Sequence, residues 1–246
     1  MRSPYVSNDH SATVTNDSIT INAKKGGAFV KNKYGGTIGL TATAGDVDIT
    51  VSGGSPSDGL NIHTSSSAKK DSRITVEGKN VTITATSPTG TARGILVENT
   101  ANAIVNGHVE VTAQQKLKIS VAGTDYAKAV GTTGAKSSVT LKSDTVEISS
   151  EASQASDNTQ GYAYGVHTSK NAITEIEARE VKVNAKNLGT KGSTVGLYAS
   201  DGTYNKELNR QSTLNVNADT LLVNAMSNVG ECREFRVQDD YYRWAI

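Results

Sequence analysis

The sequence predicts an all-β fold, a parallel β-helix of about seven coils with three strands in each coil. Two observations predict it: short segments of alternating apolar and polar residues recur along the chain, and the composition suits strands better than a compact enzyme core. Of the 246 residues only 5% are aromatic and 20% are charged, 23 are Gly and 3 are Pro, and Ser, Thr and Asn are frequent. A recurring trio of strands at a nearly constant spacing is typical of a solenoid, in which each repeat packs on its neighbours.

The first recurring segment alternates aliphatic and small polar residues and ends in a small residue. Its copies start 28, 34, 36, 29, 35 and 40 residues apart. They are Ile19–Ala23, Val47–Val51, Val81–Ala85, Leu117–Val121, Val146–Ser150, Val181–Ala185 and Leu221–Ala225. Because side chains alternate between the two faces of a strand, Val81 and Ile83 are expected to face the interior and Thr82 to face solvent.

A second segment precedes most copies of the first, and a third follows after a polar stretch of variable length. The second segments are Ile38–Leu40, Ile74–Val76, Val109–Val111, Val139–Leu141 and Leu214–Val216, and a weaker copy has Thr174 before Ile176. The third segments are Gly59–Ile62, Gly94–Val97, Gly165–Thr168 and Gly196–Ala199, with degraded copies at Ala28–Val30 and Lys128–Val130. The polar stretches, of which Glu151 to Tyr164 is the longest, are expected on one side of the rod.

Two outward columns of side chains follow from this alignment. One is uniformly small and polar and is expected to form a hydrogen-bonded ladder: Asn22, Thr50, Thr84, Ser120, Ser149, Asn184 and Asn224. The other includes Lys118, Glu147 and Lys182 in successive coils. Opposite charges on neighbouring strands favour the in-register stack by about 0.2–1 kcal/mol per pair.

The chain is expected to divide into a leader or cap at residues 1–11, a solenoid at 12–229 and an atypical tail at 230–246. The tail holds the only Cys, Cys232, and the only Trp, Trp244. One interpretation is a cap that closes the last coil. The favoured one is a truncation artefact, because the change occurs where the seventh copy should enter its turn and third strand.

The repeats of the form Ile74–Val76, Val81–Ala85 and Gly94–Val97, with outward positions rich in Ser, Thr and Asn, resemble the passenger region of a bacterial autotransporter (type V secretion) adhesin. The resemblance covers roughly residues 12–229 and lies in the form of the repeat, without a catalytic motif. It implies a right-handed β-helix, exported through an outer-membrane barrel that follows the passenger, and a location outside the cell or on the bacterial outer-membrane surface. The chain carries neither a signal peptide nor the barrel, so a fragment is expected, with membrane contact only through that missing barrel domain.

Other function classes have little support in the sequence. The net charge of +1 indicates no general attraction to nucleic acid or anionic membranes. A single cysteine excludes a multi-cysteine metal site, and no cofactor or metal is expected. No Gly-x-Ser-x-Gly elbow occurs and the four histidines are scattered, which argues against serine hydrolysis.

A polysaccharide lyase or glycoside hydrolase is the alternative, since such enzymes need carboxylates that converge on one outward face. Glu110 and Glu175 are expected to share an outward column with Thr140 between them, hence about 10 Å apart. That spacing is at or beyond the wide end for an inverting pair. Because no Arg or His joins them in that column, they are interpreted as solvated surface charges, and no catalytic residue is assigned.

The candidate binding strip is the outward column of the third segments, predicted as Val30, Asn61, Leu96, Val130, His167 and Tyr198. This column is more apolar than the Ser, Thr and Asn columns elsewhere. Tyr162 and Tyr164 from the longest polar stretch are expected to join it, forming a shallow strip for carbohydrate stacking or protein docking. The competing interpretation is that the preceding loops fold back and bury this face.

The sequence therefore predicts a non-enzymatic cell-surface adhesin or stalk that mediates adhesion or aggregation. Its expected partners are proteins or glycans on the surface of a host or neighbouring cell, bound through many weak contacts that sum by avidity. A purely structural spacer also fits, since the stacking of repeats needs no ligand.

Overall fold

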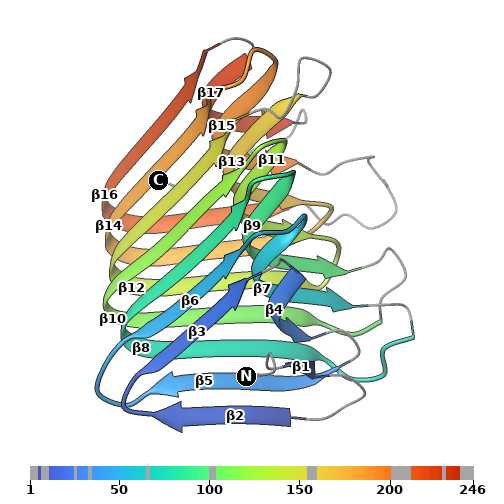
Figure 1. Cartoon of the computed structure of the whole chain (residues 1–246), viewed down its shortest axis with the longest axis vertical. Coiled ribbons are helices and arrows are strands. Elements are labelled where there is room, and N and C mark those ends of the chain that lie inside the picture. Colours follow the sequence, from blue (N-terminus) through green and yellow to red (C-terminus); the bar gives the residue numbers. More distant parts are fainter. Residues whose placement is uncertain are drawn as a thin grey trace.

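The computed structural model describes residues 5–6, 11–24, 27–32, 35–64, 67–99, 104–153, 160–200, 212–228 and 231–238. Every regular element in these ranges is a β-strand, and every paired strand runs parallel to its neighbours. The strands are stacked in successive layers along the long axis of the molecule (Figure 1). The predicted all-β, parallel β-helix fold is confirmed, while its handedness and the number of coils stay predictions.

Sheet A contains the third segment of each repeat. Its eight strands, in spatial order, are β1 (Tyr5–Val6), β4 (Gly27–Asn32), β7 (Ser57–Thr64), β9 (Thr91–Asn99), β11 (Tyr126–Thr133), β13 (Gly161–Ser169), β15 (Gly192–Ser200) and β17 (Glu231–Gln238). Neighbours in space are successive turns of the chain, so one whole turn of the solenoid connects each parallel pair.

Sheet B contains the first and second segments. Its nine strands are β2 (Ser11–Asn16), β3 (Ile19–Lys24), β5 (Gly36–Ala42), β6 (Val47–Ser52), β8 (Ser72–Ser87), β10 (Gly107–Gly123), β12 (Ser137–Ala152), β14 (Ile173–Asn187) and β16 (Thr213–Ser227). The two segments are separate strands in β2/β3 and β5/β6. From β8 onward they join into one long strand, and a register shift of β10 between Ala113 and Lys116 marks the joint.

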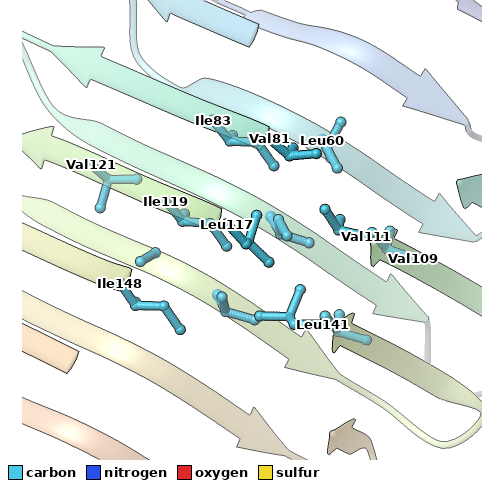
Figure 2. Close-up of a cluster of buried hydrophobic side chains, with 14 of the residues drawn as sticks. Leu60, Val81, Ile83, Val109, Val111, Leu117, Ile119, Val121, Leu141 and Ile148 are labelled. Atoms are coloured by element: carbon cyan, nitrogen blue, oxygen red, sulfur yellow. The ribbon is translucent and has the colours of Figure 1, made fainter. Parts of the chain in front are cut away.

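Equivalent segments pair residue for residue, which puts the aliphatic positions in continuous inward columns. One such column is Ile19, Val47, Val81, Leu117, Val146, Val181 and Leu221. Figure 2 shows Ile83, Ile119 and Ile148 following one another on successive strands, all essentially without solvent exposure. Burial of each such side chain contributes about 1.5–3 kcal/mol, which is the main term that opposes the entropy of ordering the strands.

The weaker second segment has a polar residue in an inward column. Thr174 pairs with Val139 and Leu214 and is completely buried. Its hydroxyl oxygen lies 2.8 Å from that of Thr132 and 2.7 Å from that of Thr168, two further inward residues from sheet A. The three hydroxyls satisfy one another, so a polar residue is tolerated inside the shaft.

Each strand of sheet A from β4 to β17 carries one irregularity at the start of the third segment, where β7, β9, β13 and β15 have a Gly. In the pairs from β4/β7 to β15/β17 the ladder skips this position. Lys128 pairs with Tyr164 and Val130 with Val166, for example, whereas Ala129 and Gly165 between them are unpaired. In β7, β9, β11, β13 and β15 the unpaired residue faces inward, as does the residue after it, so the alternation of faces shifts by one. A Cβ at the equivalent Gly94 would lie 2.5 Å from Cγ2 of Ile119 on the opposite sheet, so the sheets approach closely here.

The polar ladder on sheet B is confirmed as a single column. The Ser149 hydroxyl donates to that of Ser120 over 3.0 Å, and the Asn224 amide donates to Asn184 over 2.9 Å. Lys118, Glu147 and Lys182 also share a column, but the ion pairs differ from the predicted ones. Glu147 pairs with Lys116 at 2.8 Å, from the neighbouring outward position, and Lys182 pairs with Glu180 of its own strand at 2.8 Å.

Part of the predicted tail lies in sheet A. Glu231–Gln238 forms β17, which pairs in parallel with β15 and continues the stack, and Cys232 is exposed. Trp244 and the rest of 239–246 lie outside the described residues, as do residues 1–4 and 7–10 of the predicted leader. Within the described ranges no helix is long and apolar enough to cross a membrane.

The close approach of the sheets generates the first prediction. We expect Gly94→Val to lower the free energy of unfolding by about 1–3 kcal/mol, as overpacking does in other cores, because the valine side chain would collide with Ile119. The measurement is the midpoint of urea unfolding, followed by circular dichroism. Gly39→Ala is the matched control, since a Cβ there meets its nearest atoms at an ordinary 3.5 Å. Equal midpoints for the Gly94 variant and wild type would contradict this account of the shaft.

Candidate functional site

The outward face of sheet A carries most of the residues predicted for the binding strip. The outward column is Lys31, Asn61, Leu96, Gly131, His167 and Tyr198, so Leu96, His167 and Tyr198 stand where the sequence predicts them. Tyr162 and Tyr164 lie on β13, which also carries His167.

The placement of Val130 and Val30 in this strip is wrong. Val130 pairs with Ile95 and Val30 pairs with Leu60, in the inward column, and both valines are completely buried. The physical reason is the unpaired position of each strand. In these two degraded copies this position holds Ala129 and Phe29 instead of Gly. An alignment that starts one residue earlier, at Lys128 or Ala28, is therefore displaced by one residue.

Gly131 occupies the outward position that was assigned to Val130. Because Gly131 has no side chain, neighbouring side chains occupy the space beside it. A Cβ on Gly131 would lie 2.5 Å from Cδ of Lys128 and 3.2 Å from Cδ1 of Leu96. The methylene stem of Lys128 therefore folds along its own strand over Gly131 and packs beside Leu96. Only 7% of Lys128 and 6% of Leu96 remain exposed, although both lie on the outward face.

Five rings gather beside this lysine and form what we call the aromatic cluster: Tyr126, Tyr162, Tyr164, His167 and Tyr198. Tyr162 and Tyr164 are stacked with planes 5° apart and centroids 6.3 Å apart. His167 and Tyr198 are stacked at 13° and 4.6 Å, and Tyr164 stacks on both of them. Tyr126 is tilted by 45° to Tyr164 at 5.5 Å.

Most of the ring pairs in the cluster are roughly parallel, with centroids 4.6 to 6.3 Å apart. Because stacking occupies part of the ring faces, these faces are less available to a sugar. The edge of an aromatic ring carries partial positive charge, whereas its face carries negative charge. This geometry differs from the predicted strip, in which ring faces were expected to stack on a sugar.

The ammonium group of Lys128 lies against two of these rings. Its Nζ is 5.2 Å from the centroid of Tyr126 and 5.8 Å from that of Tyr164, within the range of cation–π attraction. Burial, with a smaller contribution from the nearby Arg93, lowers the pKa of Lys128 to about 8. Burial also raises the pKa of the Tyr126 hydroxyl. Within the part of the chain that the structure describes, no carboxylate forms an ion pair with Lys128.

His167 serves as a neutral ring in the stack. Burial lowers its pKa to about 2, and the positive charges of Lys128 and Lys170 act in the same direction. Both ring nitrogens are buried without a hydrogen-bond partner among the described residues. An imidazole that stays neutral and stacked is poorly suited to accept and release a proton in catalysis.

An ion pair borders the cluster on the side of β9 and β7. Arg93 binds Asp58 through two bonds, Nε to Oδ1 at 2.6 Å and Nη2 to Oδ2 at 2.9 Å. The Asn61 amide donates to Oδ2 of Asp58 over 2.7 Å. Asp58 is 2% exposed and the Arg93 side chain is 22% exposed, so this bidentate pair is a partly buried unit next to Lys128.

Three contributors were missed in the sequence: Tyr126, Lys128 and the Arg93–Asp58 pair. Tyr126 pairs with Tyr162 in one column, so extending the third segment toward its N-terminal side would have found it. Lys128 had no such signal, because its burial depends on the missing side chain of Gly131.

The loops predicted to bury this face are described only in part, since residues 154–159 of the longest one lie outside the described residues. Tyr198 is only 9% exposed, whereas Tyr162, Tyr164 and His167 are half-buried. The accessible part of the cluster is therefore centred on β13.

The carboxylates considered for an enzyme lie on sheet B. Glu110, Thr140 and Glu175 share an outward column as predicted, and no Arg or His lies in it. The adjacent column nevertheless supplies both: Arg73 Nη2 lies 2.6 Å and His108 Nε2 lies 3.8 Å from Oε2 of Glu110.

His108 is also tied to its neighbour, since its Nδ1 lies 2.8 Å from the Ser138 hydroxyl. Its pKa is lowered, first by burial and then by Arg73. The arrangement is a chain of hydrogen bonds and ion pairs across neighbouring strands.

Comparison with protein-family models, with curated proteins and with solved structures finds no match in any of the three. Within the described ranges, no group of three or more His, Cys, Asp or Glu side chains is placed to hold a metal ion. The site is therefore interpreted from its own geometry.

The lowered pKa of Lys128 generates the second prediction. Between pH 8 and pH 10 the unfolded chain keeps a proton that folded Lys128 has lost, so the stability of the wild type should rise with pH. The expected slope is about 1 kcal/mol per pH unit. Lys128→Met should remove this slope, whereas Lys118→Met, on the exposed face of sheet B, should keep it. Urea unfolding at four pH values measures the slopes, and equal slopes in wild type and Lys128→Met would refute the assignment.

The lowered pKa of His167 generates the third prediction, which concerns stability at acidic pH. Below pH 6.5 the unfolded chain takes up a proton that the folded ring refuses until about pH 2, so stability should fall as the pH falls. His167→Phe keeps a ring in the stack and should flatten the loss between pH 6 and pH 4 by about 1 kcal/mol per pH unit. The control is His63→Gln, because His63 lies at the surface beside Glu98, at 3.4 Å. An unchanged acid profile for His167→Phe would count against the stacked, neutral imidazole.

Proposed function

We propose that the chain is a non-enzymatic adhesin, a fragment of a bacterial autotransporter passenger that acts outside the cell or on the outer-membrane surface. In this proposal a rigid β-helical rod presents the aromatic cluster to a protein or glycan on a host or neighbouring cell. The observation that carries the proposal is the aromatic cluster with Lys128 on the outward face of sheet A.

The stacking of strands does not require such a cluster. The polar ladder on sheet B consists of Ser, Thr and Asn, which pair well and stay hydrated, and it meets every structural need of an outward column. The aromatic cluster instead gathers four of the nine Tyr of the chain around a largely buried ammonium. Burying a charge without an ionic partner opposes folding, and departures of this kind concentrate at functional sites.

A polysaccharide-cleaving enzyme is the second candidate, favoured by the approach of Arg73 and His108 to Glu110. The arrangement is less suited to catalysis than to surface pairing, because the carboxylate of Glu110 is already engaged by a guanidinium at 2.6 Å. The two functions differ in a simple readout. An enzyme shortens its polymer, whereas an adhesin binds without changing the length of the polymer.

The fourth prediction tests adhesion directly. Beads coated with the protein should bind cultured epithelial cells or aggregate bacteria, and the double variant Tyr162→Ser with Tyr164→Ser should lower binding at least tenfold. These side chains are half-buried on the rod surface, so the fold should survive, which circular dichroism and the unfolding midpoint would check.

The matched control is Glu177→Gln on sheet B, which should leave adhesion unchanged. If the double variant folds and still adheres as the wild type does, the aromatic cluster is not the adhesive surface. No adhesion by the wild type would favour the spacer. Loss of polymer length on incubation with acidic polysaccharides, abolished by Glu110→Gln, would favour the enzyme instead.

A further inference from the structure

We infer that one edge of the rod binds a linear acidic polysaccharide through a row of exposed lysines. The row, which we call the basic edge, consists of Lys69, Lys70, Lys136 and Lys170. The inference rests on the proposed adhesive function, and it adds a class of ligand and a second surface beside the aromatic cluster. All four side chains lie at the surface, so a large polymer can reach them.

The lysines belong to turns that connect a strand of sheet A to the next strand of sheet B. Four of these turns are residues 67–71, 104–106, 134–136 and 170–172. Backbone hydrogen bonds join neighbouring turns: Ser72 N donates to Asn106 O over 2.8 Å, and Gly107 N donates to Lys136 O over 3.0 Å. The turns are therefore stacked at the spacing of the strands, about 4.8 Å.

The charge of the turns is concentrated on this side of the rod. In the described part of the chain, the turns here hold the four lysines and one acid, Asp71. The two carboxylate oxygens of Asp71 accept hydrogen bonds from the backbone N–H and the side-chain amide of Asn106, at 2.7 and 2.9 Å. The described turns on the opposite side hold one acid, Asp125, and one base, Lys191. A net charge of only +1 thus includes a local excess of cations at one edge.

Two of the lysines occupy a backbone conformation that favours other residues. Lys136 has a φ of 66° and Lys170 a φ of 57°, in the left-handed region where Gly and Asn are the usual residues. Gly adopts this conformation without strain. An exposed lysine therefore opposes the turn instead of stabilising it, and strain of this kind concentrates at functional sites.

The ammonium groups are distributed along the axis of the rod. Lys136 reaches toward the preceding turn, where its Nζ donates to Ile104 O over 2.6 Å. Its charge consequently lies between those of Lys69 and Lys170. None of these three lysines forms an ion pair with a described residue. The row offers a charge every one or two turns over a length of about 15 Å.

This spacing favours a polysaccharide over other anionic polymers. A sugar unit is about as long as one turn of the rod is thick, so acid groups on successive sugars can meet the row in register. An extended acidic peptide presents side chains on one face about 7 Å apart, which does not match the turns. Arg, which binds the phosphates of nucleic acids through two parallel bonds, is absent from the basic edge. A membrane spreads its charge over an area, whereas the row is narrow.

The basic edge continues into the aromatic cluster. Lys170 directly follows β13, and its positive charge acts on His167 of that strand. A polymer bound along the row therefore reaches the accessible part of the cluster, so the two surfaces can contact one ligand.

The fifth prediction tests the basic edge with a heparin hexasaccharide, which carries acid groups on successive sugars. Isothermal titration calorimetry in 50 mM NaCl should detect binding of this sugar and no binding of neutral isomaltohexaose. The affinity should fall about tenfold in 500 mM NaCl, because salt screens exposed charges. The double variant Lys136→Gly with Lys170→Gly should lower it about tenfold, as expected for the loss of two exposed ion pairs.

The matched control removes two positive charges elsewhere. Lys118→Met with Lys191→Gly should leave heparin binding unchanged, which separates a local row from the net charge. The urea midpoint of the Lys136 and Lys170 double variant should equal or exceed that of the wild type, because Gly relieves the left-handed positions. Lys69→Gln, at a position without a positive φ, should weaken binding by a smaller factor and does not introduce Gly.

Three results would overturn the inference. They are equal heparin binding by the wild type and the double variant, an equal loss of binding in the control, and tighter binding of single-stranded DNA, polyglutamate or phosphatidylserine vesicles than of heparin.

Failure of the inference can be told apart from failure of the proposed function. If heparin does not bind but the Tyr162 and Tyr164 double variant loses cell adhesion, the basic edge is wrong and the adhesive cluster stands. If heparin binds at the basic edge while the tyrosine double variant keeps full adhesion, the inference stands and the cluster is not the adhesive surface.

Discussion

The in-register pairing of each turn of backbone with the next is the constraint on which the rest of the structure depends. Once Val81 lies beside Leu117, every following residue of β8 up to Ser87 has its equivalent in β10 as a neighbour, and the register shift lies before this segment. Side chains are thereby sorted into columns, and a column can be uniformly apolar inside or uniformly polar outside. The aliphatic shaft consists of such columns, and the aromatic cluster forms where three neighbouring outward columns carry rings on adjacent strands.

The sequence was sufficient to predict the architecture because the first segments alternate strongly. A slip of one residue would move Ile83 and Ile119 to the solvent face, so the hydrophobic pattern determines the register. The joining of two segments into the long strands β8 to β16 was not predictable in the same way. The residues between the segments, such as Gly78 and Lys79, show no clear alternation, and their conformation depends on the neighbouring turns.

Prediction of the outward column succeeded where the Gly marker of the third segment is present and failed where it is absent. Leu96, His167 and Tyr198 follow Gly94, Gly165 and Gly196, and all three stand in the outward column. Val130 follows Ala129, and there the sequence offers nothing to separate the unpaired residue from an ordinary strand position. The role of Lys128 could not be predicted for a different reason. Its side chain packs over Gly131, and these two residues point to the same side only because of the unpaired residue between them in the folded strand.

The unpaired residue in each strand of sheet A changes which positions along one strand are neighbours. On an ordinary strand, residues three apart point to opposite faces, so the side chain of one cannot cover the other. In β11 the unpaired Ala129 turns Lys128 and Gly131 to the same side. The cationic centre of the cluster is thus assembled by a backbone irregularity within a single strand. The chemistry of this surface consequently depends on the spacing of main-chain atoms as much as on the choice of side chains.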